Sequence, residues 1–216
     1  WPSRLLSPEP PESRVSVKLV AFESPGHPKA IGVGQAMLVS APLADVKKVL
    51  EDFGHYKELF FQFKDARAVE RDGNRVITYW EQSIPLPFVP NTKYTNYFYI
   101  DDRDPTRVFY RYQLKESGSL LYSDGLIAIE KIDARSTRYT EYDFFDADWG
   151  IAGSLAPARI WRDSLRDIYY SDIAIKLRAE HPDWSFDKVR QESKKHWEDE
   201  YSEDSVGDVI SSKKKF

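Results

Sequence analysis

The hydrophobic pattern of this chain changes twice, and the changes divide it into three parts. Through the middle of the chain, apolar and polar side chains alternate, which is typical of strands that bury one face. The predicted strands span residues 66–71, 75–82, 92–100, 107–114, 119–132 (with a bulge expected at Gly125) and 137–145. Short turn-like segments separate them. This predicts an antiparallel meander, because neighbouring parallel strands need a long crossover.

Before the meander, the pattern predicts two strands and two short helices. The strands span 15–22 and 31–39. Ser40 is placed as a helix N-cap, and Pro42 suits the first helical turn. One helical face follows at steps of three, four and three residues: Leu43, Val46, Leu50 and Phe53. A second short helix is expected over 56–61.

After the meander, the spacing predicts the longest helix of the chain over 155–179. Its apolar face recurs at steps of four, three and seven residues: Trp161, Leu165, Ile168 and Ile175. Ser171 and Asp172 interrupt that face. If a cavity lies against the helix, we expect water or a polar ligand group to meet the helix there; otherwise Asp172 should point to solvent. A further helix is expected over 186–201.

Composition narrows the possible functions. The net charge of −4 and the pI of about 5.7 argue against a nucleic-acid groove. The absence of cysteine excludes disulfides and thiolate chemistry. The four histidines are dispersed, and no phosphate-binding, dinucleotide or hydrolase motif occurs, so we expect neither a metal nor a cofactor. No apolar run approaches the roughly 20 residues that span a bilayer.

The ends of the chain suggest its organisation. Residues 1–14 are rich in Pro and Ser and are interpreted as a flexible leader, residues 15–179 as one domain, and residues 180–216 as a helical extension and tail. The chain starts at Trp1 without a visible signal peptide. We interpret it as a processed product, with a bacterial periplasm or secretion favoured over the cytoplasm, and expect a monomer.

Two segments carry a family resemblance: VSAPLADVKKVLEDFGHYKELF at 39–60 and DGLIAIEKIDARSTRYTEYDF at 124–144. With the order of elements, they resemble the START-like helix-grip superfamily, which includes START lipid-binding domains, Bet v 1-like proteins and polyketide cyclases. The resemblance implies an α+β fold, in which a curved antiparallel sheet wraps around the long C-terminal helix. It also implies an apolar cavity between sheet and helix. Members bind sterols, phospholipids, fatty acyl groups or polyketides, and a minority are enzymes.

A ligand cavity would be lined by one face of the strands and by the helix. The candidates are Val76, Thr78, Trp80, Tyr110, Tyr112, Ile127, Ile129, Tyr139, Glu141, Trp161, Leu165 and Ile168. A one-residue register error would invert every strand assignment. The many tyrosines favour a partly wet cavity over a solid core, because their hydroxyls need partners. Arg111, Glu141 and Asp143 lie inside the strand patterns. An arginine–carboxylate pair among them could cross the cavity and hold a ligand hydroxyl or head group, or these side chains could face solvent on the convex side.

A proline-rich loop over 83–91 carries Leu86, Phe88 and Val89. Such apolar side chains on a stiff loop could gate a cavity or touch a membrane transiently during ligand exchange. The alternative is a rigid connection packed on the sheet edge.

Three functions stay open. The first is the binding of a hydrophobic small molecule (a lipid, sterol or fatty acyl compound) for transport or sensing. The second is a cyclase, dehydratase or hydrolase acting on an enclosed polyketide-like or aromatic substrate, with Glu141, Tyr112 and Arg111 as candidate groups. The third is an interaction protein with a filled core, whose C-terminal helix is the working surface.

Overall fold

The structure is a computed structural model of the chain. It describes residues 15–20, 26–27, 30–84, 90–147 and 157–200, without the side chains of 16–20, 31, 147, 157–165 and 197–200. The predicted leader 1–14 lies outside the described residues. So do Leu86, Phe88 and Val89 of the predicted gate.

Eight strands of the described chain form one antiparallel sheet in the order β1-β2-β8-β7-β6-β5-β4-β3. The bounds are Ser16–Val20 (β1), Ile31–Val39 (β2), Phe63–Asp72 (β3), Arg75–Gln82 (β4), Thr92–Asp101 (β5), Arg107–Ser117 (β6), Leu120–Lys131 (β7) and Thr137–Ala147 (β8). Strands β3 to β8 form the predicted meander, and β2 returns to pair with β8. The chain therefore brings its second and last strands together, and its first strand lies at one edge of the sheet beside β2.

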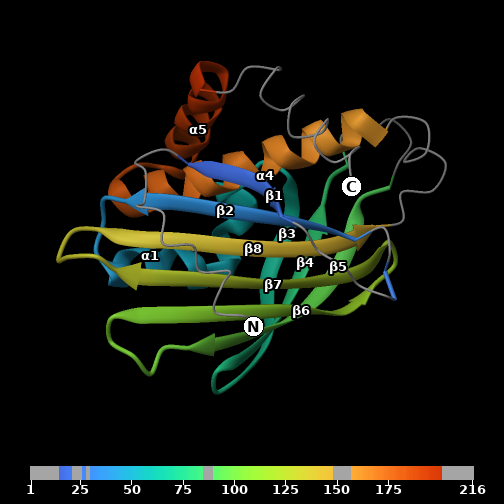
Figure 1. Cartoon of the computed structure of the whole chain (residues 1–216), viewed down its shortest axis with the longest axis horizontal. Helices are drawn as coiled ribbons and strands as arrows, with labels where there is room; N and C mark the ends of the chain where they lie inside the picture. Colours follow the sequence, from blue (N-terminus) through green and yellow to red (C-terminus); the bar gives the residue numbers. More distant parts are fainter. Residues whose placement is uncertain (1–14, 21–25, 28–29, 85–89, 148–156, 201–216) are drawn as a thin grey trace.

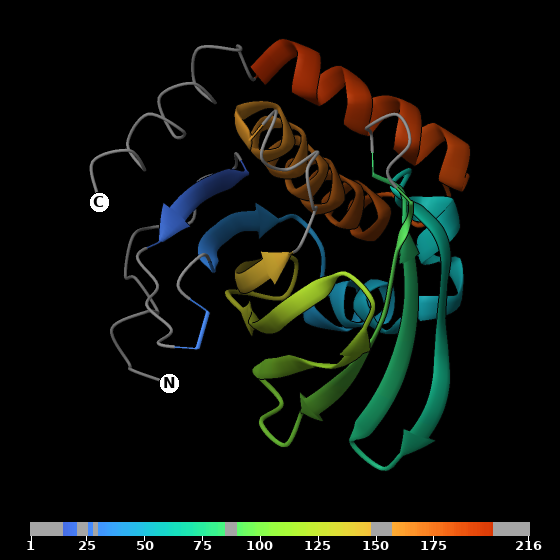
Figure 2. The same ribbon diagram turned by 90° about the vertical axis from the view of Figure 1, so that its right-hand side faces the viewer.

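The helices lie on the concave side of this sheet and beyond it. They are α1 (Leu43–Glu51), the 3₁₀ turn η1 (Phe53–His55), α2 (Tyr56–Leu59), α4 (Pro157–Glu180) and α5 (Phe186–Glu200). Figures 1 and 2 show the sheet curving around α1 and α4, with α5 packed outside α4. The predicted α+β architecture is confirmed: a curved sheet around a long helix, two short helices after β2, and one extra C-terminal helix.

Helix α1 forms because its apolar positions share one face. Val46, Val49 and Leu50 are buried on it. The predicted cap at Ser40 is wrong: the helix begins at Leu43, and Pro42 stands at the N-cap without a side-chain hydrogen bond. The Ser40 backbone N–H donates instead to Glu180 Oε1 at 2.6 Å, which ties the start of α1 to the end of α4.

Strand β7 passes straight through Gly125, so the bulge predicted there is wrong. The pairing with β6 and β8 is continuous at this residue, and the register shift lies between Leu120 and Tyr122. A glycine is required at position 125 for a steric reason. A Cβ at position 125 would lie 2.0 Å from Tyr112 Cζ, so the missing side chain makes room for the tyrosine ring across the strand.

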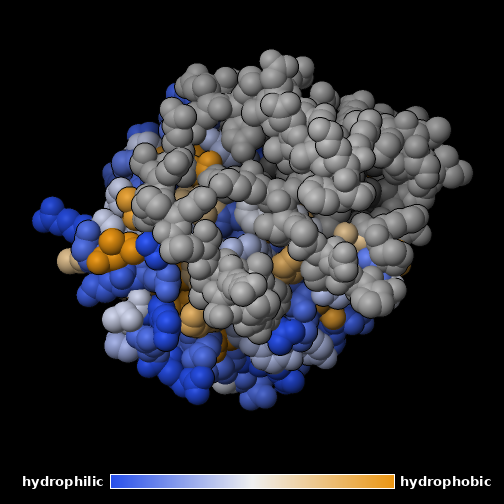
Figure 3. Space-filling view, in the orientation of Figure 1, coloured by the Kyte–Doolittle hydropathy of each residue, from blue (hydrophilic) through white to orange (hydrophobic). Residues whose placement is uncertain are grey.

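The described part of the surface seen in Figure 3 has no large apolar patch. In the view of Figure 3, the described surface is mostly hydrophilic with small scattered hydrophobic areas. The exposed large apolar side chains of the described residues come from different elements: Phe61, Val69, Tyr99, Leu121 and Ile132. Single exposed apolar residues of this kind are normal. Within the described residues, no helix has the length and apolarity to cross a membrane.

Candidate ligand cavity

A cavity of about 260 Å³ lies between the concave face of the sheet, α4 and the short helices. This volume is close to the lower limit of typical ligand pockets, roughly 300 Å³. Much of the lining is aromatic: Tyr56, Phe60, Phe63, Trp80, Tyr94, Phe98, Tyr112, Tyr139 and Phe145. The cavity extends toward the sheet end where Ile84 follows β4 and Leu120 begins β7. It is therefore mostly apolar, with a few polar groups at defined positions.

The structure places the predicted cavity residues in three groups. Trp80, Tyr112, Ile127, Tyr139, Glu141 and Ile168 line the cavity. Val76, Thr78, Tyr110 and Ile129 are fully buried beyond its lining. The side chains of Trp161 and Leu165 lie outside the described residues. Whether any of these residues binds a ligand is a separate question, and their binding roles stay predictions.

Arg111 does not lie in the cavity. Its side chain is 45% exposed, and its guanidinium lies 3.3 Å from Asp124 Oδ2. Tyr110 and Tyr112 on either side of it are both buried. Successive side chains of a strand point to opposite faces, so Arg111 belongs to the convex face. The prediction of Arg111 as a cavity residue is therefore wrong, and the solvent-facing alternative holds for it, so no pair between Arg111 and a carboxylate of the described cavity lining forms.

Glu141 accepts two tyrosine hydroxyls in the cavity wall. Tyr112 donates to Oε1 at 2.9 Å, and Tyr139 donates to Oε2. The side chain sits opposite Gln35 of β2 and Ile127 of β7. Burial raises the pKa of Glu141, and the two hydroxyls oppose that rise by stabilising the carboxylate. The result is an acid held at a fixed position in a largely apolar space.

Asp172 provides a second acid at the break in the apolar face of α4. It is 1% exposed, so it does not point to solvent. With its amide in the orientation that satisfies its neighbours, Gln35 donates to Asp172 Oδ1 at 2.7 Å and to Glu141 Oε2 at 3.2 Å. Burial raises the pKa of Asp172, and the negative charge of Glu141 raises it further. Ser171 beside it lines the cavity.

Asp143 is a third acid, predicted from the sequence together with Glu141 as a polar group that could orient a ligand. It lines the cavity two positions after Glu141 on β8. Burial raises its pKa to about 7, with a further contribution from the charge of Glu141. The alternation of β8 places both acids on one face, because residues two apart in a strand share a face.

Besides the half-buried Gln82, three buried amide side chains line the cavity and were missed: Gln35, Gln62 and Asn96. Each is at least nine-tenths buried. Gln62 donates from Nε2 to Ser171 Oγ at 2.6 Å, which links the α2–β3 segment to α4. Buried amides normally have all their polar atoms paired. Their positions depend on long-range packing, so the local sequence gave no signal for them.

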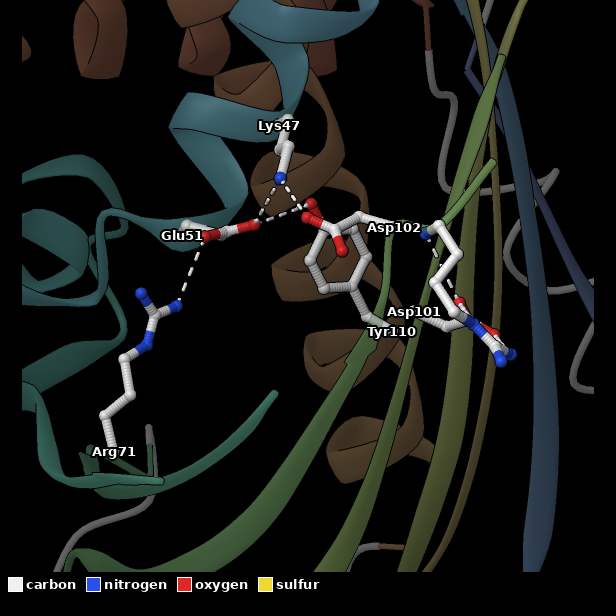
Figure 4. A network of polar contacts seen from close by, with 7 residues as sticks. Lys47, Glu51, Arg71, Asp101, Asp102 and Tyr110 are labelled. Atoms are coloured by element: carbon white, nitrogen blue, oxygen red, sulfur yellow. Dashed lines mark hydrogen bonds and ion pairs between the residues drawn. The ribbon is translucent and has the colours of Figure 1, made fainter. Parts of the chain in front are cut away.

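A largely exposed network of ion pairs lies at the other end of the sheet, away from Ile84 and Leu120 (Figure 4). Lys47 of α1 reaches Asp102 Oδ2 at 2.6 Å and Glu51 Oε1 at 3.7 Å. Arg71 of β3 lies 3.2 Å from Glu51 Oε2, and the Tyr110 hydroxyl donates to Glu51 Oε1 at 3.4 Å. The hydrogen bond from Lys47 lowers the pKa of Asp102. This network fastens α1 to the turns at that end.

The carboxylates of the described residues do not converge as metal ligands do: no group of three His, Asp or Glu side chains there could hold a metal ion. The polar chemistry visible in the cavity is therefore that of carboxyl groups, amides and tyrosine hydroxyls.

No family model and no curated protein matches the sequence. Solved structures do match its fold. A STAR-related lipid transfer protein from Xanthomonas axonopodis is 14% identical, with a TM-score of 0.55, over 85% of this chain and 95% of that one. The human StarD13 lipid transfer and protein localization domain is 14% identical, with a TM-score of 0.58, over 79% of this chain and 86% of that one. This chain has the START-like helix-grip fold.

The same helix-grip fold occurs in the Zhui aromatase/cyclase from a Streptomyces species. That enzyme is 16% identical, with a TM-score of 0.53, over 77% of this chain and 95% of that one. At such identities the likeness shows the fold alone, and one fold supports carriers and enzymes alike. The function of this helix-grip chain must be inferred from its own cavity.

Proposed function

We propose that the chain binds one largely apolar small molecule of the lipid, sterol or fatty acyl class in the cavity between sheet and α4, for transport or sensing. The observation that carries this proposal is the cavity itself. An aromatic lining with a few convergent polar groups is the usual character of a small-molecule site. Burial of apolar surface would drive binding, at about 25 cal/mol per Å².

The fold neighbours support this proposal at the level of class. Two of the similar structures carry lipid transfer in their names. No cofactor is needed for such a role, since desolvation and shape provide the affinity.

The test uses phenylnaphthylamine, an uncharged apolar fluorophore, titrated into the full chain. We expect saturable binding, and we expect Ser123→Phe to weaken it at least about tenfold by filling the cavity. Ser123 lines the cavity, whereas Leu121 on the same strand is 55% exposed. Leu121→Phe is therefore the matched control and should bind as the parent does. Thermal unfolding of both variants checks that they are folded, and Ile127→Trp provides a second way to fill the cavity.

An equal affinity for the parent and both filled variants would contradict the proposal, because the probe would then be binding elsewhere. Failure of the folded parent to bind any apolar probe would contradict it as well.

A second candidate is an enzyme acting on an enclosed polyketide-like or aromatic substrate. The specific observation is Asp143, whose pKa of about 7 suits a general acid or base near neutral pH. Glu141 and Tyr112 stay available in the cavity, whereas Arg111 does not. Turnover of a poly-β-ketone substrate that is abolished by Asp143→Asn, with binding retained, would establish this function.

A further inference from the structure

The charged groups offered to a ligand in this cavity are all of one sign. Glu141, Asp143 and Asp167 contribute carboxyl groups to its lining. Within the described lining there is no lysine, arginine or histidine, although Asp167 pairs with Arg166 outside the lining at 3.6 Å. A buried carboxylate without a cation nearby is costly, because the low-dielectric surroundings do not compensate for lost hydration. The described lining therefore offers no basic side chain to Glu141 or Asp143.

Two buried amide oxygens in the same lining also lack a donor. Gln62 Oε1 and Asn96 Oδ1 accept no hydrogen bond, although the residues are only 6% and 5% exposed. The donor bond from Gln62 Nε2 to Ser171 Oγ fixes the orientation of that amide, so its oxygen stays an acceptor. An unpaired buried acceptor destabilises the folded chain unless a ligand or water supplies the donor.

Aromatic rings complete the surroundings. Trp80 and Tyr94 stack with ring centroids 6.4 Å apart, and Phe98 stacks on Tyr112 at 5.5 Å. All four residues line the cavity. The faces of aromatic rings attract cations, most strongly where water is excluded. Carboxyl groups, orphaned amide oxygens and aromatic faces thus all favour the same kind of ligand group.

We propose that the ligand carries a protonated amine at its polar end, held among Glu141, Asp143 and the amide oxygens of Gln62 and Asn96. This inference rests on the proposed binding function and narrows its ligand class. A primary ammonium group has three N–H donors and no acceptor, which complements an acceptor-lined space. A free carboxylate would bring further acceptors and a like charge, so fatty acids are rejected by the same groups.

Proton exchange gives this binding a characteristic pH dependence. Asp143 interacts electrostatically or by hydrogen bonding with Glu141 on its own strand, Tyr112 of β6, Asp124 of β7 and Tyr94 of β5. The charge of Glu141 also raises the pKa of Asp172 on α4. The pKa of Asp143 is raised to about 7, so near neutral pH this acid is partly protonated. A bound ammonium favours the carboxylate. Amine binding therefore releases protons and tightens as the pH rises from about 6 to about 8.

The test compares decylamine, decanol and decanoate, which share one apolar chain, as competitors of phenylnaphthylamine near pH 8 and well below their micelle concentrations. We expect the affinity for decylamine to be at least about tenfold higher than the affinity for decanoate, with that for decanol between them. Asp143→Asn should remove most of the preference for decylamine over decanol. Glu130→Gln, at the far end of β7 and paired with Arg138, is the control for non-specific attraction to an acidic protein and should change nothing.

Two results would overturn the inference while leaving the proposed function intact: equal or tighter binding of decanoate, or an amine preference that survives both Asp143→Asn and Glu141→Gln. If phenylnaphthylamine itself does not bind the parent chain, the proposed function fails, and the inference fails with it. Thermal unfolding of each variant shows whether a lost preference reflects the side chain or a lost fold.

Discussion

The two polar clusters of this molecule contain similar acids in opposite situations. At the end of the sheet away from Ile84 and Leu120, Lys47 lies between Glu51 and Asp102. Glu141 of the cavity lining and the neighbouring buried Asp172 share an amide donor from Gln35, and no described basic side chain lines the cavity. The pKa of Asp102 is lowered by its hydrogen bond with Lys47, whereas burial raises the pKa of Asp143 to about 7.

This difference is what we expect if the first cluster is structural and the second binds the proposed ligand. Exposed ion pairs fasten α1 to the sheet at little cost, because water still solvates the charges. Buried acids without cations destabilise the folded chain at neutral pH, so a fold gains nothing from them by themselves. Buried acids that lower the free energy of unfolding of the chain by itself are explained if a bound ligand supplies the positive charge that they lack.

The largest expected effect on stability comes from overpacking the part of the cavity wall where Tyr112 contacts Glu141. Gly125→Ala places a Cβ 2.0 Å from Tyr112 Cζ, and that ring is fixed by its bond to Glu141. We expect a loss of about 2–3 kcal/mol in the free energy of unfolding, as for other overpacked sites. Chemical denaturation measures it. Gly118→Ala, with no atom within 4 Å of the added Cβ, is the control and should cost much less. Equal stability of the two variants would show that Tyr112 is free to move.

A smaller effect, of opposite sign, is expected from neutralising a cavity acid. Asp143 keeps its proton up to about pH 7 in the folded chain, but only to about pH 4 in the unfolded chain. Stability should therefore fall as the pH rises between those values. Asp143→Asn removes this loss, so the variant should be more stable than the parent near pH 8 and no more stable near pH 4. A destabilised variant at both pH values would contradict the unfavourable charging of this buried acid.

The smallest effect should come from the ion-pair network. Asp102 has a lowered pKa, so its contribution is present above about pH 4 and is lost as the pH falls below its folded-state pKa. Asp102→Asn should cost about 0.5 kcal/mol or less near neutral pH, because the pair with Lys47 is exposed. High salt should reduce that cost further. A loss as large as that of Gly125→Ala would mean that the network, and not the cavity wall, limits stability.

Local periodicity predicted most of this fold and part of the cavity. The alternation of β4, β6, β7 and β8 placed Trp80, Tyr112, Ile127 and Glu141 on the concave face, where the structure has them. The prediction of Arg111 as a cavity residue conflicted with this alternation, because Tyr110 and Tyr112 point to the face opposite to that of the residue between them. The orphaned oxygens of Gln62 and Asn96 were beyond prediction, because they arise from packing between segments far apart in sequence. The shared donor Gln35 likewise depends on the pairing of β2 with β8.

A crystal structure of the chain with bound decylamine tests the proposed amine site most directly. We expect the alkyl chain between the sheet and α4, with the nitrogen within hydrogen-bond distance of Glu141 or Asp143 and of Gln62 Oε1 or Asn96 Oδ1. Decylamine bound only on the outer surface, or bound in the cavity with its nitrogen turned away from these acids, would contradict it.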